Sequence, residues 1–179
     1  GEVQSGNIKE VKFEWILDNP ISSRGETYIA EIDSNLNFSI EIPVERIAMG
    51  RVSIGNNYHD ICLIPGDDFF ISIDGDAIEY SGEGAGKNNF LYHAEINGLW
   101  NRDYYRESNR RKLTPAEFLE SMKDFKQRRI DFLDSYIDSV KVQDEFVELY
   151  RTDTEVIYEA LLQQYPRGYA YVNKIALDS

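Results

Sequence analysis

The chain has 179 residues, of which 42% are hydrophobic and 13% aromatic, and its formal net charge at pH 7 is -13. This length and apolar content are typical of a globular protein with one domain or two small ones, and they exclude a disordered chain. The negative charge disfavours nucleic acid as a partner, because it repels the phosphate backbone.

No apolar run approaches the roughly 20 residues that a membrane-spanning helix needs. Gly1 is typical of a tag remnant, so the absence of a signal peptide from this sequence carries little weight. The single cysteine, Cys62, cannot form an internal disulfide, and the redox compartment is therefore left open.

The first half of the chain predicts about seven strands. Apolar and polar residues alternate over residues 9–18, as in a strand with one buried face. Turn residues such as Gly55-Asn56-Asn57 and Pro65-Gly66 separate the further strands, which are expected at residues 27–32, 38–42, 51–54, 58–64, 69–74 and 78–81. Such close spacing indicates an antiparallel β-sandwich or an open barrel, and we expect a β-sandwich domain over residues 7–85.

The second half predicts helices. A cluster of glycines at residues 82–86 ends the strand pattern, and Asn88 or Asn89 is expected to cap a first helix. Thr114-Pro115-Ala116-Glu117 has the pattern of a capping box and begins an apolar face of some 25 residues. A third helix is expected over residues 144–164, ending before Pro166. The predicted fold class is therefore α+β, with a helical region over residues 86–179.

Gly86-Lys87 follows a run of small residues, which suggests a phosphate-binding loop. The pattern G-x-x-x-x-G-K-[ST] requires glycine where Ser81 stands and a hydroxyl where Asn88 stands, so a plain domain junction is favoured.

Acidic and amide side chains suggest calcium at two places. Asp33, Asn35 and Asn37 have the spacing of a calcium loop but lack its glycine and its final glutamate, so a hairpin turn is favoured. Four further carboxylates lie at the ends of one strand and are expected to be solvated, with weak calcium binding as the alternative: Asp67, Asp68, Asp74 and Asp76.

The sequence shows no catalytic constellation, and we expect neither a cofactor nor a metal. His59 and His93 lie far apart in the chain and have no cysteine or histidine partner at zinc-ligand spacing. Cys62 stands between Ile61 and Leu63 in a strand, which favours a buried, inert thiol over a nucleophile served by His59.

One basic and aromatic stretch departs from the acidic average. Aromatic residues combined with arginine are common at protein interfaces, so the predicted partner-contact residues are Trp100, Tyr104, Tyr105 and Arg106. Further cations follow up to Lys112. The alternative is that the aromatic residues pack between the two halves while the arginines offset acidic neighbours.

A resemblance to a known family rests on two stretches. They are Leu63-Ile64-Pro65-Gly66-Asp67-Asp68 with the alternating strand after it, and Tyr80-Ser81-Gly82-Glu83-Gly84 leading to Asn88-Asn89-Phe90-Leu91. The chain resembles the N-terminal domain that precedes the thioredoxin-like domain in envelope thiol-disulfide oxidoreductases of anaerobic Gram-negative bacteria. Residues 28–42 are similar to that family's paired strands, and helices resembling residues 114–165 often bridge to its thioredoxin-like part.

The resemblance implies a non-catalytic accessory domain that positions, docks or dimerises an exported periplasmic or envelope protein. The family's activity lies in a Cys-x-x-Cys pair on the later domain, which this chain does not contain, so no catalytic residue is carried over and this chain alone is not expected to be an enzyme. The expected partner is a thioredoxin-like domain or a second copy, and a lipid anchor outside this chain would supply any membrane attachment, as in a lipoprotein. The alternative is a glycan- or peptide-binding β-sandwich module of the envelope.

Overall fold

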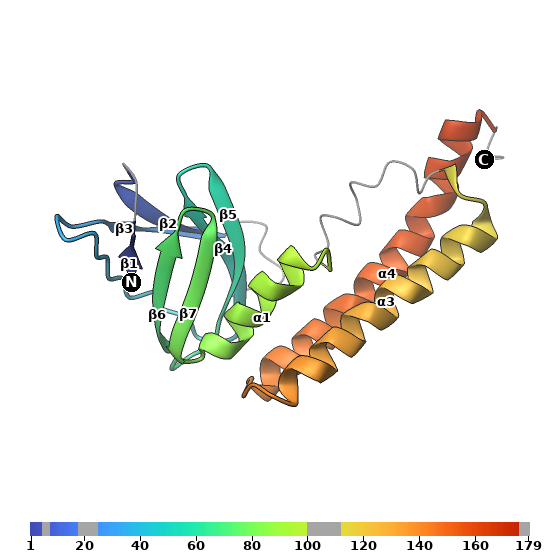
Figure 1. Ribbon diagram of the computed structural model, residues 1–179. Helices are drawn as coiled ribbons and strands as arrows, with labels where there is room; N and C mark the ends of the chain where they lie inside the picture. Colours follow the sequence, from blue (N-terminus) through green and yellow to red (C-terminus); the bar gives the residue numbers. More distant parts are fainter. Residues whose placement is uncertain (5–7, 18–24, 100–111, 176–179) are drawn as a thin grey trace. The chain divides into compact units, whose positions relative to one another are not determined.

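The structure is a computed structural model that describes residues 1–4, 8–17, 25–99 and 112–175 (Figure 1). The predicted α+β class is confirmed, since the described residues form two mostly antiparallel sheets and three helices. The chain divides into two compact units, residues 1–93 with 140–146, and residues 94–139 with 147–179. These units group α1 (Ala85–Ile96) up to His93 with the strands, whereas the sequence pattern places the whole helix in the helical region.

The strand unit holds seven strands in its described residues. One sheet has the order β3-β2-β4-β5 and is antiparallel throughout; its strands are β2 (Glu10–Leu17), β3 (Glu26–Glu31), β4 (Ala48–Ile54) and β5 (Asn57–Leu63). The other has the order β1-β6-β7, with β1 (Glu2–Val3), β6 (Asp68–Asp74) and β7 (Ala77–Glu83). In it β6 pairs antiparallel with β7 and parallel with β1. Neither sheet is closed.

A single cluster of buried apolar side chains is shared by the two sheets. It contains Val11 and Phe13 from β2 as well as Ile71 and Ile73 from β6, all exposed by 3% or less. Alternate residues of a strand point to opposite faces, so the alternation of apolar residues in the sequence produces one inward face on each strand. At about 25 cal/mol per Å², burial of these faces is the main term that stabilises the unit.

The strand predicted at residues 38–42 is wrong. Residues 38–44 alternate in burial, with Phe38, Ile40, Ile42 and Val44 turned inward, but no ladder joins them to another strand in the described residues. The periodicity of the sequence reflects which side chains are buried, and it carries no information on whether the backbone is paired. The seventh strand is instead β1, whose two residues are too short for a periodic signal.

The expected cap of the first helix is also wrong, because α1 begins at Ala85 and contains both Asn88 and Asn89. Their side chains accept hydrogen bonds from backbone groups outside the helix instead, from Cys62 at 2.8 Å and Tyr80 at 2.9 Å. Asparagine is a frequent cap because its short side chain bonds backbone amides, and here it bonds the amides of neighbouring strands.

The helical unit confirms the capping box at the start of α3 (Pro115–Ile137). The Thr114 side chain accepts a hydrogen bond from the amide of Glu117, and the Glu117 carboxylate accepts one from the amide of Thr114. Phe118, Met122 and Phe125 of α3 form a buried cluster with Ile157 and Leu161 of the next helix. No helix among the described residues is both long enough and apolar enough to cross a membrane.

The last helix, α4 (Asp144–Asn173), continues past its predicted end and contains Pro166. Proline inside a helix removes a hydrogen bond and normally costs about 3 kcal/mol. Packing on both sides offsets this cost, because the Tyr165 ring stacks on Phe118 with centroids 3.9 Å apart and Ala170 is 3% exposed. On the same helix Val156 is 59% exposed, whereas the neighbouring Ile157 is buried.

Candidate functional site

The start of α1 holds a buried ion pair between Lys87 and Asp67. The Lys87 ammonium lies 2.7 Å from each carboxylate oxygen of Asp67 and 2.8 Å from the carbonyl oxygen of Gly84. The Lys87 side chain is 0% exposed and the Asp67 side chain 7%. The expectation that Asp67 is solvated is therefore wrong, whereas Asp68, Asp74 and Asp76 are exposed as predicted. Asp67 differs because the turn at Pro65-Gly66 points its carboxylate inward.

The Asp67 carboxylate also fixes the backbone around it. It accepts a hydrogen bond from the amide of Ile64 at 2.7 Å and one from the side-chain amide of Gln143 at 3.0 Å. Gly84 has a φ of 86°, and a Cβ on it would collide with this carboxylate. With three oxygen partners, the Lys87 ammonium has used its three donors. A phosphate-binding role for Gly86-Lys87 therefore has no support in the geometry.

Asn88 and Asn89 join α1 to two strands. The Asn88 side-chain oxygen accepts from the backbone amide of Cys62, and its buried NH₂ group has no hydrogen-bond partner in the described residues. Asn89 makes two hydrogen bonds to the backbone of Tyr80, accepting from its N–H at 2.9 Å and donating to its carbonyl at 2.7 Å. The Asn89 side chain thus makes the two backbone hydrogen bonds to Tyr80 that a neighbouring strand would otherwise make, at the point where α1 crosses β7.

The Cys62 thiol is buried, as predicted, and is 0% exposed. Burial raises the pKa of this thiol to about 12, against a smaller opposite effect of the nearby Lys87 charge. Because the thiolate is the nucleophilic form, the neutral thiol that burial favours is unreactive at pH 7. His59 is 8% exposed and packs edge-on against Tyr92, with ring centroids 5.5 Å apart.

The other predicted site residues fall into two groups. Asp33 accepts hydrogen bonds from the backbone amides of Asn35 and Asn37 at 2.8 and 2.9 Å, which confirms a turn at these residues. It is not a hairpin turn, because residues 38–44 do not form a strand that pairs with β3. Trp100, Tyr104, Tyr105 and Arg106 lie outside the described residues. Within residues 1–4, 8–17, 25–99 and 112–175, no group of three or more His, Cys, Asp or Glu side chains is placed to hold a metal ion.

A second buried cation, Arg129, lies in the helical unit. Its guanidinium donates to the Thr154 hydroxyl at 3.0 Å, the Leu99 carbonyl at 3.1 Å and the Asp153 carboxylate at 3.3 Å. It also lies over the Tyr150 ring, 4.4 Å from the centroid. Like Lys87, Arg129 has partners in the protein on several sides, so it supports the packing of its unit and offers no open anion site.

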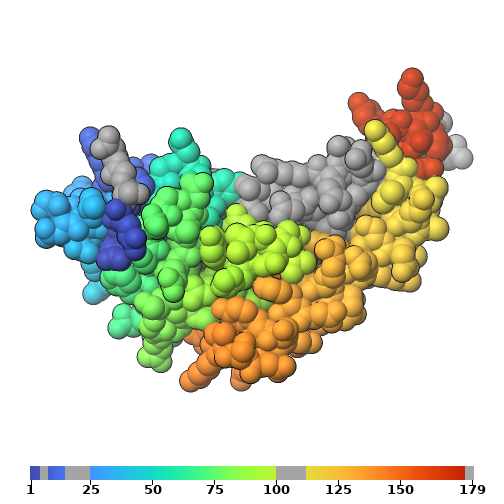
Figure 2. Space-filling view, viewed as in Figure 1, coloured from blue at the N-terminus to red at the C-terminus, as the bar shows by residue number. Residues whose placement is uncertain are grey.

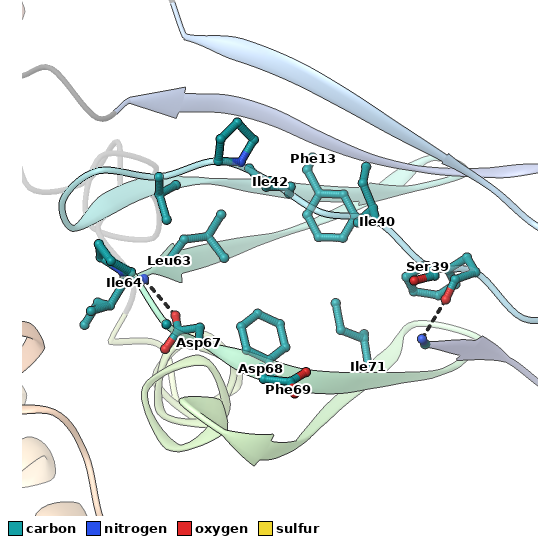
Figure 3. A pocket seen from close by; sticks show the side chains of 16 residues that line it. Phe13, Ser39, Ile40, Ile42, Leu63, Ile64, Asp67, Asp68, Phe69 and Ile71 are labelled. Carbon is teal, nitrogen blue, oxygen red and sulfur yellow. Dashed lines mark hydrogen bonds between the residues drawn. The ribbon is translucent and has the colours of Figure 1, made fainter.

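Sequence reasoning missed a pocket of about 430 Å³ in the strand unit. It lies between the two sheets, and Figure 3 shows the side chains that line it; the apolar ones labelled there are Phe13, Ile40, Ile42, Leu63, Ile64, Phe69 and Ile71. Gly1, Ser39 and Asp68 also line it. The only available signal was indirect: residues 38–44 alternate like a strand, yet the sequence does not show which strand would pair with them.

The pocket suits an extended ligand that has both apolar and polar groups. Most of the side chains that line the pocket are aliphatic or aromatic, whereas most of the surface exposed inside it is polar. Its carboxylates are Asp67, which already accepts from Lys87, Ile64 and Gln143, and the exposed Asp68. A pocket with apolar walls and unpaired backbone along one side can bind a polypeptide strand through main-chain hydrogen bonds. The described residues that line it include no paired acid and base of the kind that proton transfer requires.

Comparison of this chain with family models, with curated proteins and with solved structures found no match.

Proposed function

We propose that this chain is a non-catalytic β-sandwich accessory domain of a cell-envelope thiol-disulfide oxidoreductase-like protein, which docks, positions or dimerises the redox domain. The expected partner is a thioredoxin-like domain or a second copy of the chain. The resemblance supplies the biological setting, and the structure supplies one supporting observation about the residues that carry that resemblance.

That observation is that the polar side chains of the residues that carry the resemblance hold the fold together. Asp67 closes the turn after β5 and holds Lys87, while Asn88 and Asn89 bond the backbone of Cys62 and Tyr80. Each of these polar side chains is directed to a partner inside its own unit. The motif therefore accounts for how α1 is fastened to the sheets, and a docking domain needs such a rigid scaffold more than it needs reactive groups.

The test measures docking and redox chemistry separately. The chain is titrated calorimetrically with a purified thioredoxin-like domain of an envelope oxidoreductase, and its self-association is followed by sedimentation. We expect one of the two associations, and we expect it to weaken with salt and with the Tyr104→Ala, Arg106→Glu double variant, because an attraction between the basic stretch and an acidic surface is screened by ions. Absence of both associations at low salt would refute the docking role.

The redox arm uses insulin reduction. The chain alone is expected to stay at the background rate, because one thiol cannot cycle through an internal disulfide and the Cys62 thiol is buried. The Cys62→Ser variant is the control. An activity of the wild-type chain that disappears in this variant would contradict a non-catalytic role.

A further inference from the structure

We propose that the pocket between the sheets binds one further β-strand, formed by polypeptide that continues β1 on the amino side of Gly1. This strand would pair with residues 38–44 on one side and with β6 on the other. The proposal does not depend on the redox setting proposed above. It rests on the way in which the first residues already lie between these two segments.

The existing hydrogen bonds of the first residues define the register on the side of residues 38–44. Gly1 and Phe38 exchange two backbone hydrogen bonds, from the Phe38 amide to the Gly1 carbonyl at 2.9 Å and from the Gly1 amino group to the Phe38 carbonyl at 2.8 Å. Glu2 forms an antiparallel bridge with Asn37. In an antiparallel pair such doubly bonded positions recur every second residue. The second residue upstream of Gly1 would therefore pair with Ile40 and the fourth with Ile42.

The register on the β6 side is equally defined. β1 runs parallel to β6 with Glu2 level with Ser72, and the Gln4 amide donates to the Ile73 carbonyl at 2.8 Å. One step back along both strands places Gly1 level with Ile71, and two further steps place the second upstream residue level with Phe69. Every second residue of a strand points its N–H and C=O groups to the same side. Ile71 and Phe69 therefore direct these groups, like Ile73, toward the space between β6 and residues 38–44, which we call the slot.

The two registers independently predict the same alternation of side chains. The first upstream residue would lie between Ser39 and Phe70, which are both exposed. The second would lie between Ile40 and Phe69, which both line the pocket. A strand in the slot would thus turn its second and fourth upstream side chains into the apolar cavity and its first and third toward solvent.

A further observation favours this occupant. The space-filling view shows the dark-blue amino-terminal residues between the light-blue segment that follows β3 and the green strands β6 and β7 (Figure 2).

The test compares two four-residue extensions before Gly1, which differ in which of their side chains face the pocket. An in-phase extension, Val-Thr-Ile-Thr, places its apolar side chains in the cavity, and the matched control, Thr-Val-Thr-Ile, has the same composition but the opposite alternation. Amide exchange is measured by NMR at Ile40 and Ile42, with the Asn35 amide as an internal reference. We expect the in-phase extension to slow exchange at Ile40 and Ile42 by about tenfold or more and to raise the midpoint of thermal unfolding, because ladder hydrogen bonds protect amides.

Three results would overturn the proposal. Equal protection of the Ile40 and Ile42 amides by both extensions would show that binding in the slot does not depend on which side chains face the pocket. Protection by neither would show that the pocket is not a strand site. Protection of Ile40 by a free acetylated peptide of the in-phase sequence, added to the chain that begins at Gly1, together with no protection by the attached extension, would assign the pocket to a partner's peptide.

Discussion

The buried ion pair between Lys87 and Asp67 is expected to tolerate the loss of both charges better than the loss of one. Lys87→Met leaves the Asp67 carboxylate buried without its cation, and breaking a buried pair in this way typically costs about 3–5 kcal/mol. Adding Asp67→Asn to Lys87→Met removes the stranded charge while an amide oxygen can still accept from Ile64. We therefore expect the double variant to recover part of the free energy of unfolding.

Urea unfolding followed by circular dichroism measures these differences. Lys12→Met is the matched control, because Lys12 lies in the same unit and its ion pair with Glu10 is exposed. If Lys87→Met is no more destabilising than Lys12→Met, the ion pair does not fasten α1 to the sheets.

At the level of residues, sequence reasoning succeeds where a side chain's surroundings are local. The burial of Cys62 follows from its apolar neighbours in a strand, and the Asp33 turn follows from the spacing of Asp33, Asn35 and Asn37. The ion pair between Lys87 and Asp67 joins residues 20 positions apart, and it depends on how α1 packs on the turn after β5. No local sequence pattern shows a contact between residues so far apart, which is why the sequence predicts a solvated Asp67.

Among the elements, the capping box of α3 allows a prediction with a pH dependence. Thr114→Ala removes the hydroxyl that caps the helix and is expected to cost about 1 kcal/mol at pH 7. Hydrogen bonds from Thr114 lower the pKa of Glu117. A lowered pKa in the folded state stabilises the fold above the unfolded value of about 4.3, and this contribution is lost as the pH falls below it. The difference between wild type and variant should therefore narrow in acid.

Thermal unfolding at pH 7 and pH 3 checks this expectation, with Thr114→Ser as the control that keeps the hydroxyl. Thr114→Ser should stay close to wild type at both pH values. A serine variant as unstable as the alanine variant would show that the cap contributes through packing of the threonine methyl group.

The elements also show where local pattern is sufficient. The start of α3 was predictable because the capping box needs only four neighbouring residues. The end of α4 was not, because the helix continues through Pro166 only where Tyr165 and Ala170 gain packing that offsets the missing hydrogen bond. Residues 38–44 have the alternation of a strand, and whether they form one depends on a partner strand that alternation cannot reveal.

On the scale of the whole molecule, the change from strand to helix periodicity was predictable, but the grouping of the segments was not. The period changes near Gly84, yet the strand unit includes α1 up to His93 and a return segment, residues 140–146. A Cβ on Gly86 would collide with the carbonyl of Lys141, which shows how closely the return segment approaches α1. Contacts of this kind arise between distant parts of the chain, and one sequence read along its length does not show them.

Hydrogen exchange can test this grouping through Phe146. Its side chain is 1% exposed and meets the Phe90 ring of α1 edge-on, with centroids 5.7 Å apart, and Gln143 in the same segment donates to Asp67. Phe146→Ala removes a large buried side chain, a change that typically costs about 3–5 kcal/mol. We expect faster exchange by mass spectrometry in peptides that cover β5 and residues 85–93, because local opening follows the packing that holds an element in place.

Leu161→Ala is the matched control, since Leu161 is also buried but belongs to the cluster formed with Phe118 and Met122. It should accelerate exchange in α3 and leave β5 unchanged. If Phe146→Ala accelerates exchange only in α3 and α4, residues 140–146 are held by the helices alone and the unit boundary lies elsewhere. If it accelerates β5 and α1 while Leu161→Ala does not, the strand unit is built from two separate stretches of the chain, and a fragment cut after α1 would lack part of its own core.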